Sequence, residues 1–223
     1  IFSSKLIGAI PLIIDDILRA IKASLNLVNY SSYKYDNSRL DFFKKTSLLI
    51  SGLLFTTFSF GMIFGRYNFK KNYQKIFISD WPEELKNYKI VHISDLHLGS
   101  FNNVEKLEEV VSIINQENPG VVVFTGDLVN NYYHEAIPYV ETLKKIKSKH
   151  GKFSILGNHD YCDYVGLKRS SKKWKENFQN LLDLEKHAGF DLLLNESREI
   201  FIGDNKYNII GVENWGAGKF NKD

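Results

Sequence analysis

The sequence predicts an α/β fold from about residue 86 onward, because short β-rich runs alternate there with amphipathic helical stretches. The first β-rich runs cover 89–94, 121–125 and 152–156, and later runs cover 191–194, 199–202 and 207–212. Apolar residues at helical spacing predict helices over 103–117, 135–149 and 173–187. Such alternation is typical of a sheet buried by flanking helices.

The first part of the chain has a different character. Residues 46–65 carry no charge, and they are bracketed by Lys44, Lys45 and Arg66. A helix of this length matches the roughly 30 Å of a bilayer core, so the segment predicts a transmembrane helix. A buried core helix is the alternative, because six Ser/Thr and three Gly soften the hydrophobicity.

The domain organisation follows from these stretches. We interpret residues 1–45 as the end of an earlier membrane segment with a basic loop, 66–85 as a linker, and 86–223 as the α/β domain. The parent protein is then expected to be an integral, multi-pass membrane protein. Basic residues balance on the two flanks of 46–65, so they do not assign the membrane side.

Charge is distributed unevenly along the chain. Residues 1–75 hold eleven Lys/Arg against four Asp/Glu, whereas residues 76–223 hold eighteen against twenty-two. A basic excess confined to the N-terminal third favours a membrane surface as partner and disfavours nucleic acid. Ordinary solvated charge is the alternative.

Each helix of the predicted domain has a recognisable end. In the first, Val104, Leu107, Val111 and Ile114 share one face, and Asn118-Pro119-Gly120 ends the helix. Gly151 follows the stripe at 135–149, and Gly189 follows the stripe at 173–187.

Polar side chains follow directly on three of the predicted strands. Asp95 and His97 come after the first, Gly126-Asp127 after the second, and Gly157-Asn158-His159-Asp160 after the third. In layered α/β folds, ligands gather outside the carboxyl ends of the strands. These blocks are therefore expected to meet in one cleft.

The residue types in these blocks suit a pair of metal ions. Asp95 and His97 are two residues apart, so in an extended segment both would leave the same face and bind one ion. Asp127 could bridge two cations, and Asn158 could add an amide oxygen to the second. Carboxylate with imidazole favours two divalent ions such as Mn, Fe or Zn, which would activate a metal-bound water for attack on phosphorus.

His159 is the candidate catalytic residue. A leaving alkoxide needs a proton or a hydrogen bond as the P–O bond breaks, and imidazole titrates in the useful range. Asp160 is expected to orient His159 or its loop.

The ordered blocks resemble the calcineurin-like metallophosphoesterase superfamily, whose pattern is D-x-H, G-D, then G-N-H-D/E. The segments SDLHLGSFN, FTGDLVNN, SILGNHDYCDY and IIGVENWG are similar to its membrane-attached branch, which includes YkuE-type and transmembrane metallophosphoesterase-domain proteins. The resemblance implies that residues 86–223 form the N-terminal part of a β-sandwich flanked by helices. It also implies that Asp95, His97, Asp127 and Asn158 bind metal and that His159 is catalytic.

Two departures from the family pattern qualify this resemblance. Purple acid phosphatases carry a Tyr three residues after the bridging Asp, where this chain has Asn130. The later His and the Gly-His-x-His block do not follow Asp160, and His187 reads as a solvated helix residue. We therefore expect a chain truncated at both ends. This segment alone should bind metal weakly and hydrolyse little, whereas the intact parent protein should be active.

The function expected from the sequence is metal-dependent phosphoester hydrolysis. The substrate would be a phosphodiester or pyrophosphate, possibly lipid-linked, such as a UDP-diacylglucosamine-type lipid. The alternative is a non-catalytic scaffold of the same fold at the membrane. Basic residues after the third block could steer an anionic headgroup, or could simply be a solvated helix start; they are Lys168, Arg169, Lys172, Lys173 and Lys175.

Overall fold

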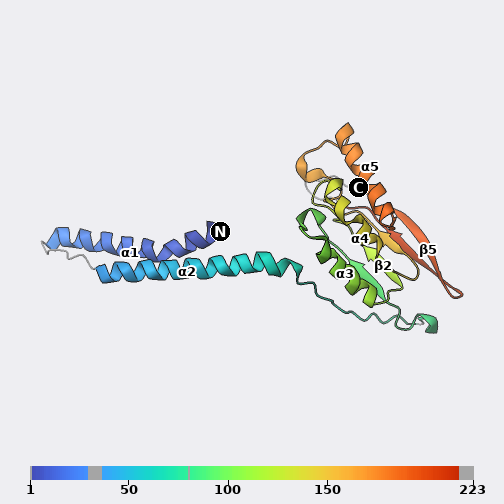
Figure 1. Cartoon of the computed structure of the whole chain (residues 1–223), viewed down its shortest axis with the longest axis horizontal. Coiled ribbons are helices and arrows are strands. Elements are labelled where there is room, and N and C mark those ends of the chain that lie inside the picture. Colours follow the sequence, from blue (N-terminus) through green and yellow to red (C-terminus); the bar gives the residue numbers. More distant parts are fainter. Residues whose placement is uncertain (1, 30–36, 80, 216–223) are drawn as a thin grey trace. The chain divides into compact units, whose positions relative to one another are not determined.

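The computed structural model describes residues 2–29, 37–79 and 81–215 (Figure 1). The chain divides into two compact units, Ile1–Asn72 and Tyr73–Asp223. The second unit begins within the segment predicted to be a linker, where the Tyr73 hydroxyl donates a hydrogen bond to Glu117 Oε1 at 2.7 Å.

The first unit is a helical hairpin of α1 (Phe2–Asn29) and α2 (Asn37–Phe64). The helices approach closely at Gly8, where a Cβ atom would overlap the Ser51 hydroxyl. Asp15 is 1% exposed, and its carboxylate pairs with Arg19 on its own helix and with Arg39 on α2, both at 3.0 Å. The contact between the two helices is thus built from small and charged residues.

The transmembrane span expected at 46–65 is not found. Residues 46–64 do lie in α2, yet in the part of the chain described here no helix is both long and apolar enough to cross a membrane. Hydroxyl and glycine residues dilute the apolar character of α2. Thr56 and Thr57 turn their hydroxyls back onto the Gly52 and Leu53 carbonyls at 2.9 and 2.8 Å.

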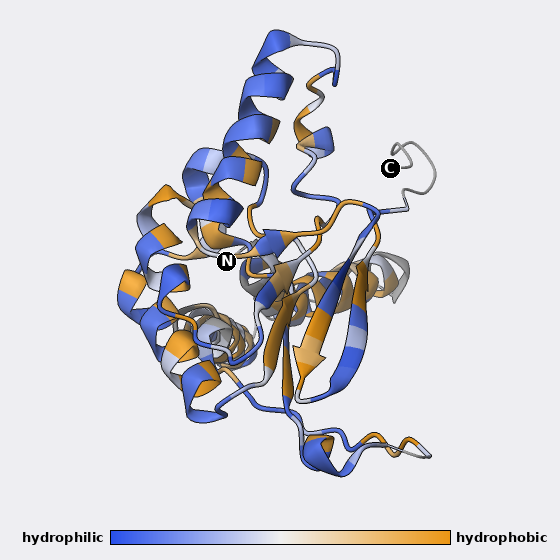
Figure 2. Cartoon of the chain, turned by 90° about the vertical axis from the view of Figure 1, so that its right-hand side faces the viewer, coloured by the Kyte–Doolittle hydropathy of each residue, from blue (hydrophilic) through white to orange (hydrophobic). Residues whose placement is uncertain are grey.

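The second unit is an α/β unit, as the alternation of strands and helices predicted, and its main sheet is parallel. Its strands are β1 (Ile90–Ile93), β2 (Val121–Phe124), β3 (Lys152–Ser154) and β4 (Asp191–Leu192), in the order β1-β2-β3-β4. Because all four run in the same direction, their carboxyl ends share one edge of the sheet. Figure 2 shows the apolar character of this central sheet beside the mostly hydrophilic helix α5.

Helices cover one face of this sheet. Asn103 is the N-cap of α3 (Val104–Gln116), and Ser171 is the N-cap of α5 (Lys172–His187). Each cap side chain accepts a hydrogen bond from a backbone N–H of the first turn. Together with α4 (Val140–Lys144) they bury a core around Phe124. The sequence prediction was accurate for α3 and α5.

The helix predicted over 135–149 is wrong in extent. The segment instead contains the short 3₁₀ helices Tyr133–Glu135 and Ile137–Tyr139, followed by the five residues of α4. Pro138 cannot donate a backbone hydrogen bond, which favours a break at this point. Beyond α4, Asn115 holds the backbone of Lys145 and Lys147 in a non-helical path.

The other face of the parallel sheet packs against a β-hairpin. β5 (Glu196–Ile202) and β6 (Asn205–Gly211) are antiparallel, and Ile200 of the hairpin joins Val121, Phe153 and Leu193 in a second core. Helices, parallel sheet and hairpin therefore form three layers, with the carboxyl edge of the sheet left free to carry polar loops.

A buried carboxyl lies between α5 and the sheet. Glu185 is 1% exposed and accepts a hydrogen bond from the Ser154 hydroxyl. Burial and, to a smaller extent, the neighbouring Asp160 together raise the pKa of Glu185 to about 8, against the lowering effect of the Ser154 hydrogen bond. Because the folded pKa is raised, the folded state holds a proton that the unfolded state has released. Stability should therefore fall as the pH rises from about 4.5, the ordinary value, to about 8.

Glu185→Gln tests this linkage. The unfolding free energy of the variant should decrease less with rising pH than that of wild type. At pH 9 the variant should be more stable than wild type by about 2 kcal/mol, since a neutral amide costs less to bury than a carboxylate. Urea unfolding of the intact protein at pH 5, 7 and 9 measures the effect. Glu176→Gln, at an exposed position of the same helix, is the matched control. Parallel pH curves for Glu185→Gln and wild type would contradict the assignment.

Candidate metal centre

The three polar blocks lie where the sequence places them, just beyond β1, β2 and β3. Backbone hydrogen bonds fasten the first two loops together: Asp95 N–H donates to Gly126 O at 3.0 Å, and His97 N–H donates to Asp127 O at 2.9 Å. The main chain thus fixes the spacing of these side chains before any ion contributes.

Three site residues adopt the left-handed backbone conformation. The φ angles of Asp95, His97 and Asp127 are 55°, 44° and 58°. Each such non-glycine residue costs about 1–3 kcal/mol, and conformations of this kind cluster at functional sites. The expectation that an extended segment aligns Asp95 with His97 is therefore wrong. Tight turns bring His97 Nε2 to 4.0 Å from Asp95 Oδ1.

The centre of the site is a cluster of His97, Asp127 and His159, whose potential ligand atoms all lie within 4.8 Å of one another. His97 Nε2 is 3.6 Å from Asp127 Oδ2. Two imidazoles and a carboxylate, with Asp95 beside them, form a donor set that suits a borderline divalent metal.

His159 is held at several points. Its Nδ1 lies 2.6 Å from the Asn130 carbonyl oxygen, so Nδ1 carries the proton and Nε2 is the nitrogen left for chemistry. Its ring packs edge-to-face against His97, with centroids 4.7 Å apart. Its backbone N–H donates to Asp127 Oδ1 at 2.9 Å. The two oxygens of Asp127 therefore face different neighbours, His159 N–H and His97.

Asp160 is fully buried and joins two of the loops. Its carboxylate accepts hydrogen bonds from the backbone N–H of Asp127 (2.7 Å), Leu128 (2.9 Å), Val129 (3.3 Å) and Gly157 (2.9 Å). Burial raises its pKa to about 7, against the opposing effect of these donors. Asp160 therefore holds together the loops of the second and third blocks. From the sequence we expected it to orient His159 or the loop of the third block.

Glycine is required where these two loops meet. A Cβ atom on Gly157 would overlap the Asp127 carboxylate, and a Cβ atom on Gly126, whose φ is 89°, would overlap the Gly157 backbone. The loops can approach this closely only because both residues lack side chains.

Sequence reasoning missed two residues at the site. Glu135 accepts hydrogen bonds from the N–H groups of Asn130, Asn131 and Tyr132 at 2.6, 3.2 and 3.0 Å, which fixes the Asn130 carbonyl beside His159. Glu135 follows Tyr132 by three residues, but Tyr is not an N-cap residue of the capping-box pattern, so the sequence contains no clear signal for this role. Tyr164 stacks on His159 and contacts Asn158, and nothing in its spacing signals this.

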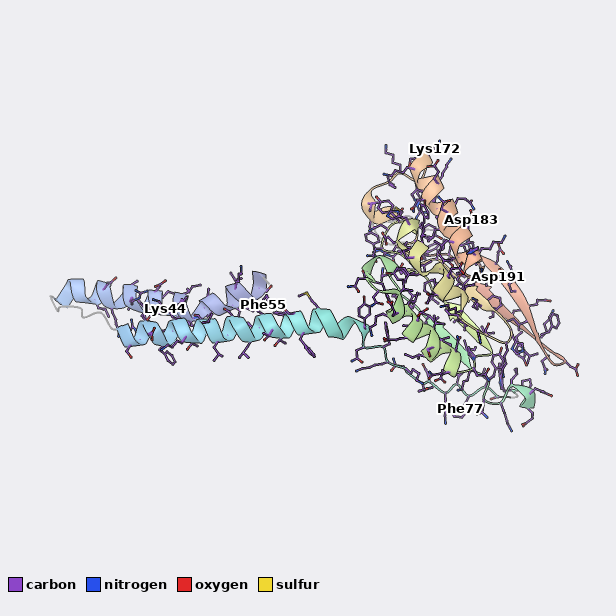
Figure 3. The ribbon with its side chains drawn as sticks, viewed as in Figure 1. Lys44, Phe55, Phe77, Lys172, Asp183 and Asp191 are labelled. Carbon is purple, nitrogen blue, oxygen red and sulfur yellow. The ribbon has the colours of Figure 1, made fainter. Side chains whose placement is uncertain are left out.

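Polar residues outside the three blocks form ion pairs with neighbouring carboxylates. His187 is exposed and pairs with Glu141 at 3.1 Å, as expected for a solvated helix residue. Arg169 pairs with Asp163 at 2.7 Å, and Lys172, at the start of α5 (Figure 3), lies 3.6 Å from Glu176.

Comparison with known proteins gives a consistent family assignment. Residues 88–222 match the family model described as calcineurin-like phosphoesterase. The chain is 37% identical to the uncharacterized metallophosphoesterase YkuE of Bacillus subtilis over 87 residues, which are 37% of this chain and 30% of that protein. It is 34% identical to an uncharacterized metallophosphoesterase of Aquifex aeolicus over 125 residues, covering 56% of this chain and 42% of that protein.

A vertebrate relative is also similar. The transmembrane protein with metallophosphoesterase domain of Danio rerio is 39% identical over 80 residues, covering 36% of this chain and 18% of that protein. The matched segment is less than half the length of each of these relatives. No solved structure matches the chain.

Proposed function

Because the chain belongs to the calcineurin-like phosphoesterase family, we propose that the cluster of His97, Asp127 and His159 is the centre of a metal-dependent phosphoester hydrolase. The observation that carries the proposal is the convergence of three strand-end loops on one group of imidazole and carboxylate side chains. A scaffold protein would need neither this donor set nor left-handed backbone at Asp95, His97 and Asp127.

The donor set fits two divalent ions of the Mn, Fe or Zn type. In this proposal Asp95 and His97 would hold one ion, Asn158 would offer its amide oxygen to the other, and the Asp127 carboxylate would serve both. When bound, such ions polarise a phosphoryl group and lower the pKa of water. The chain's own contribution is to hold these side chains at fixed spacing through the bonds of Asp160 and Glu135.

His159 is the proposed catalytic residue. With Nδ1–H committed to the Asn130 carbonyl, the ring presents Nε2 in a fixed orientation. In the imidazolium form Nε2 also carries a proton, and this proton can be donated to the departing oxygen of the substrate as the P–O bond breaks, which leaves the neutral ring protonated at Nδ1.

Metal removal tests the activity. The intact protein should hydrolyse bis(p-nitrophenyl) phosphate, lose this activity after treatment with a chelator, and regain it with Mn²⁺ or Zn²⁺. Elemental analysis before and after treatment gives the bound metal. Metal binding without turnover of phosphodiester or pyrophosphate substrates would instead favour the scaffold alternative.

We also propose that the helical hairpin attaches the protein to a membrane. Its buried residues include the charged Asp15, the polar Ser47 and the small Gly8, while many of its large apolar side chains are exposed. This is the reverse of a water-soluble hairpin. Close packing at small residues with buried paired charges is typical of helices surrounded by lipid. Among the exposed apolar residues are Leu6, Ile10, Ile13, Ile17, Ile21, Leu48, Leu49, Leu53 and Phe58.

Flotation with phosphatidylcholine vesicles tests the attachment. Wild type should float with the vesicles, and the variant Ile17→Glu/Leu49→Glu/Leu53→Glu should lose most of this association, because three charges enter the apolar exterior. Ser24→Glu, at an exposed polar position of α1, is the control. Equal flotation of the triple variant, with helix content unchanged by circular dichroism, would contradict the proposal.

Attachment suggests the class of substrate. We propose a lipid-linked phosphodiester or pyrophosphate, of which a UDP-diacylglucosamine-type lipid is one example. In vesicles containing the protein, a lipid-linked pyrophosphate should be cleaved faster than its soluble headgroup. Equal rates would limit the proposal to phosphoester hydrolysis without lipid preference.

A further inference from the structure

Tyr164 contacts two of the proposed site residues at once. It lies in the 3₁₀ helix Asp163–Val165, four residues after Asp160. Its ring stacks on the His159 imidazole with centroids 4.3 Å apart and planes inclined by 16°. Its hydroxyl oxygen accepts a hydrogen bond from Asn158 Nδ2 at 2.6 Å.

The contact with Asn158 selects an orientation of the amide. An Asn side chain offers one oxygen and two N–H donors from opposite sides of its terminal carbon, and only the oxygen can bind a cation. In the observed arrangement Nδ2 faces the Tyr164 hydroxyl, so Oδ1 lies on the side of the amide away from the phenol. A phenolic hydroxyl can donate as well as accept, so its role is to hold the amide plane, and without this bond the amide could turn about its Cβ–Cγ bond.

The contact with His159 fixes the plane of the ring. His97 and this imidazole form a T-shaped pair, and Nδ1 donates a hydrogen bond to the Asn130 carbonyl. The Tyr164 ring, which lies against the face of the imidazole, is the contact that limits tilting of the ring plane. Stacked aromatic pairs contribute beyond their buried area, so the contact adds to the order of the ring.

The backbone around Tyr164 is itself held in place. Cys162 and Gly166, on either side of the 3₁₀ helix, have φ angles of 60° and 70°. The Asp163 carboxylate accepts two hydrogen bonds from Arg169, from Nε at 3.1 Å and from the Nη2 nitrogen at 2.7 Å. The Arg169 guanidinium in turn lies over the Tyr161 ring. Tyr164 is nonetheless 47% exposed, so core packing alone does not explain its position.

We infer that Tyr164 is a positioning residue of the site, whose hydroxyl orients the Asn158 amide toward metal and whose ring orients His159. This inference rests on the proposed metal-dependent function. Its two parts are separable, because Tyr164→Phe removes the hydroxyl and keeps the ring, whereas Tyr164→Leu removes both.

Two measurements on the intact protein test it. Equilibrium dialysis with Mn²⁺ or Zn²⁺ should show about three- to tenfold weaker metal binding in both variants, the effect expected for loss of one hydrogen bond. In the metal-free protein, the His159 ring proton resonances should move downfield in Tyr164→Leu, where the stacked ring is lost, and should stay in place in Tyr164→Phe. Tyr88→Phe is the control, since Tyr88 stacks on His150 and bonds its Nδ1 at 2.8 Å outside the site.

Each outcome decides one part. Metal affinity of Tyr164→Phe equal to that of wild type and Tyr88→Phe would overturn the role of the hydroxyl. Unchanged His159 resonances in Tyr164→Leu would overturn the role of the ring. If wild type itself binds no divalent metal, the proposed function and the role of the hydroxyl fail together. The His159 resonances would still decide the role of the ring.

Discussion

Replacing His159 with glutamine should lower kcat for phosphodiester hydrolysis by about 10²–10⁴-fold, the range typical of losing a general acid. The reason is that glutamine cannot deliver a proton from the position of Nε2 to the departing oxygen. Metal content should stay near that of wild type, because the proposed ligands Asp95, His97, Asp127 and Asn158 remain. Turnover of bis(p-nitrophenyl) phosphate and elemental analysis of the same sample give both quantities.

A control variant at a second histidine separates this effect from the general loss of an imidazole. His187→Gln changes the same side chain at an exposed position on α5, where the imidazole pairs with the Glu141 carboxylate at 3.1 Å. It should leave turnover unaffected. If His159→Gln loses metal together with activity, His159 is a ligand and not the proton donor, in keeping with its place in the three-residue cluster. Wild-type turnover in His159→Gln would remove the catalytic role altogether.

The edge of the sheet that carries the candidate site could be predicted from sequence because it depends on a simple rule. Strands β1, β2 and β3 are parallel, so whatever follows each strand must emerge at the same edge. The β-rich runs and the polar blocks after them are both local features of the sequence. Their convergence needed no knowledge of loop geometry.

The loops themselves could not be predicted in this way. The left-handed turns at Asp95 and His97 depend on hydrogen bonds to Gly126 and Asp127, some thirty residues further along the chain. The short α4 likewise depends on a competing contact, since Asn115 of α3 takes up backbone groups that the expected helix would have used. The spacing of residues within one segment does not indicate hydrogen-bond partners from other segments.

The membrane prediction shows a different limit. The uncharged run over 46–65 identified α2, but its six Ser/Thr and three Gly lower the hydropathy more than the prediction of a transmembrane helix allowed, and no helix in the part of the chain described here meets the requirement for a span. The burial of Asp15 between Arg19 and Arg39 was not foreseen either, because it arises only when α1 packs against α2. That packing is what now supports attachment to lipid.

Asp127→Asn should abolish stable metal binding and, with it, hydrolysis. Removing the contacts around a metal ligand typically costs 10–100-fold in affinity, so loss of the carboxylate proposed to lie between two ions should cost about 100-fold or more. The amide can still accept the hydrogen bond from His159 N–H through its oxygen, so the loop should keep its path. Elemental analysis and circular dichroism distinguish these effects. Asp183→Asn, on α5 (Figure 3), makes the same change at an exposed site and should retain wild-type metal content. Full retention of both ions by Asp127→Asn would show that Asp127 is not the bridging ligand.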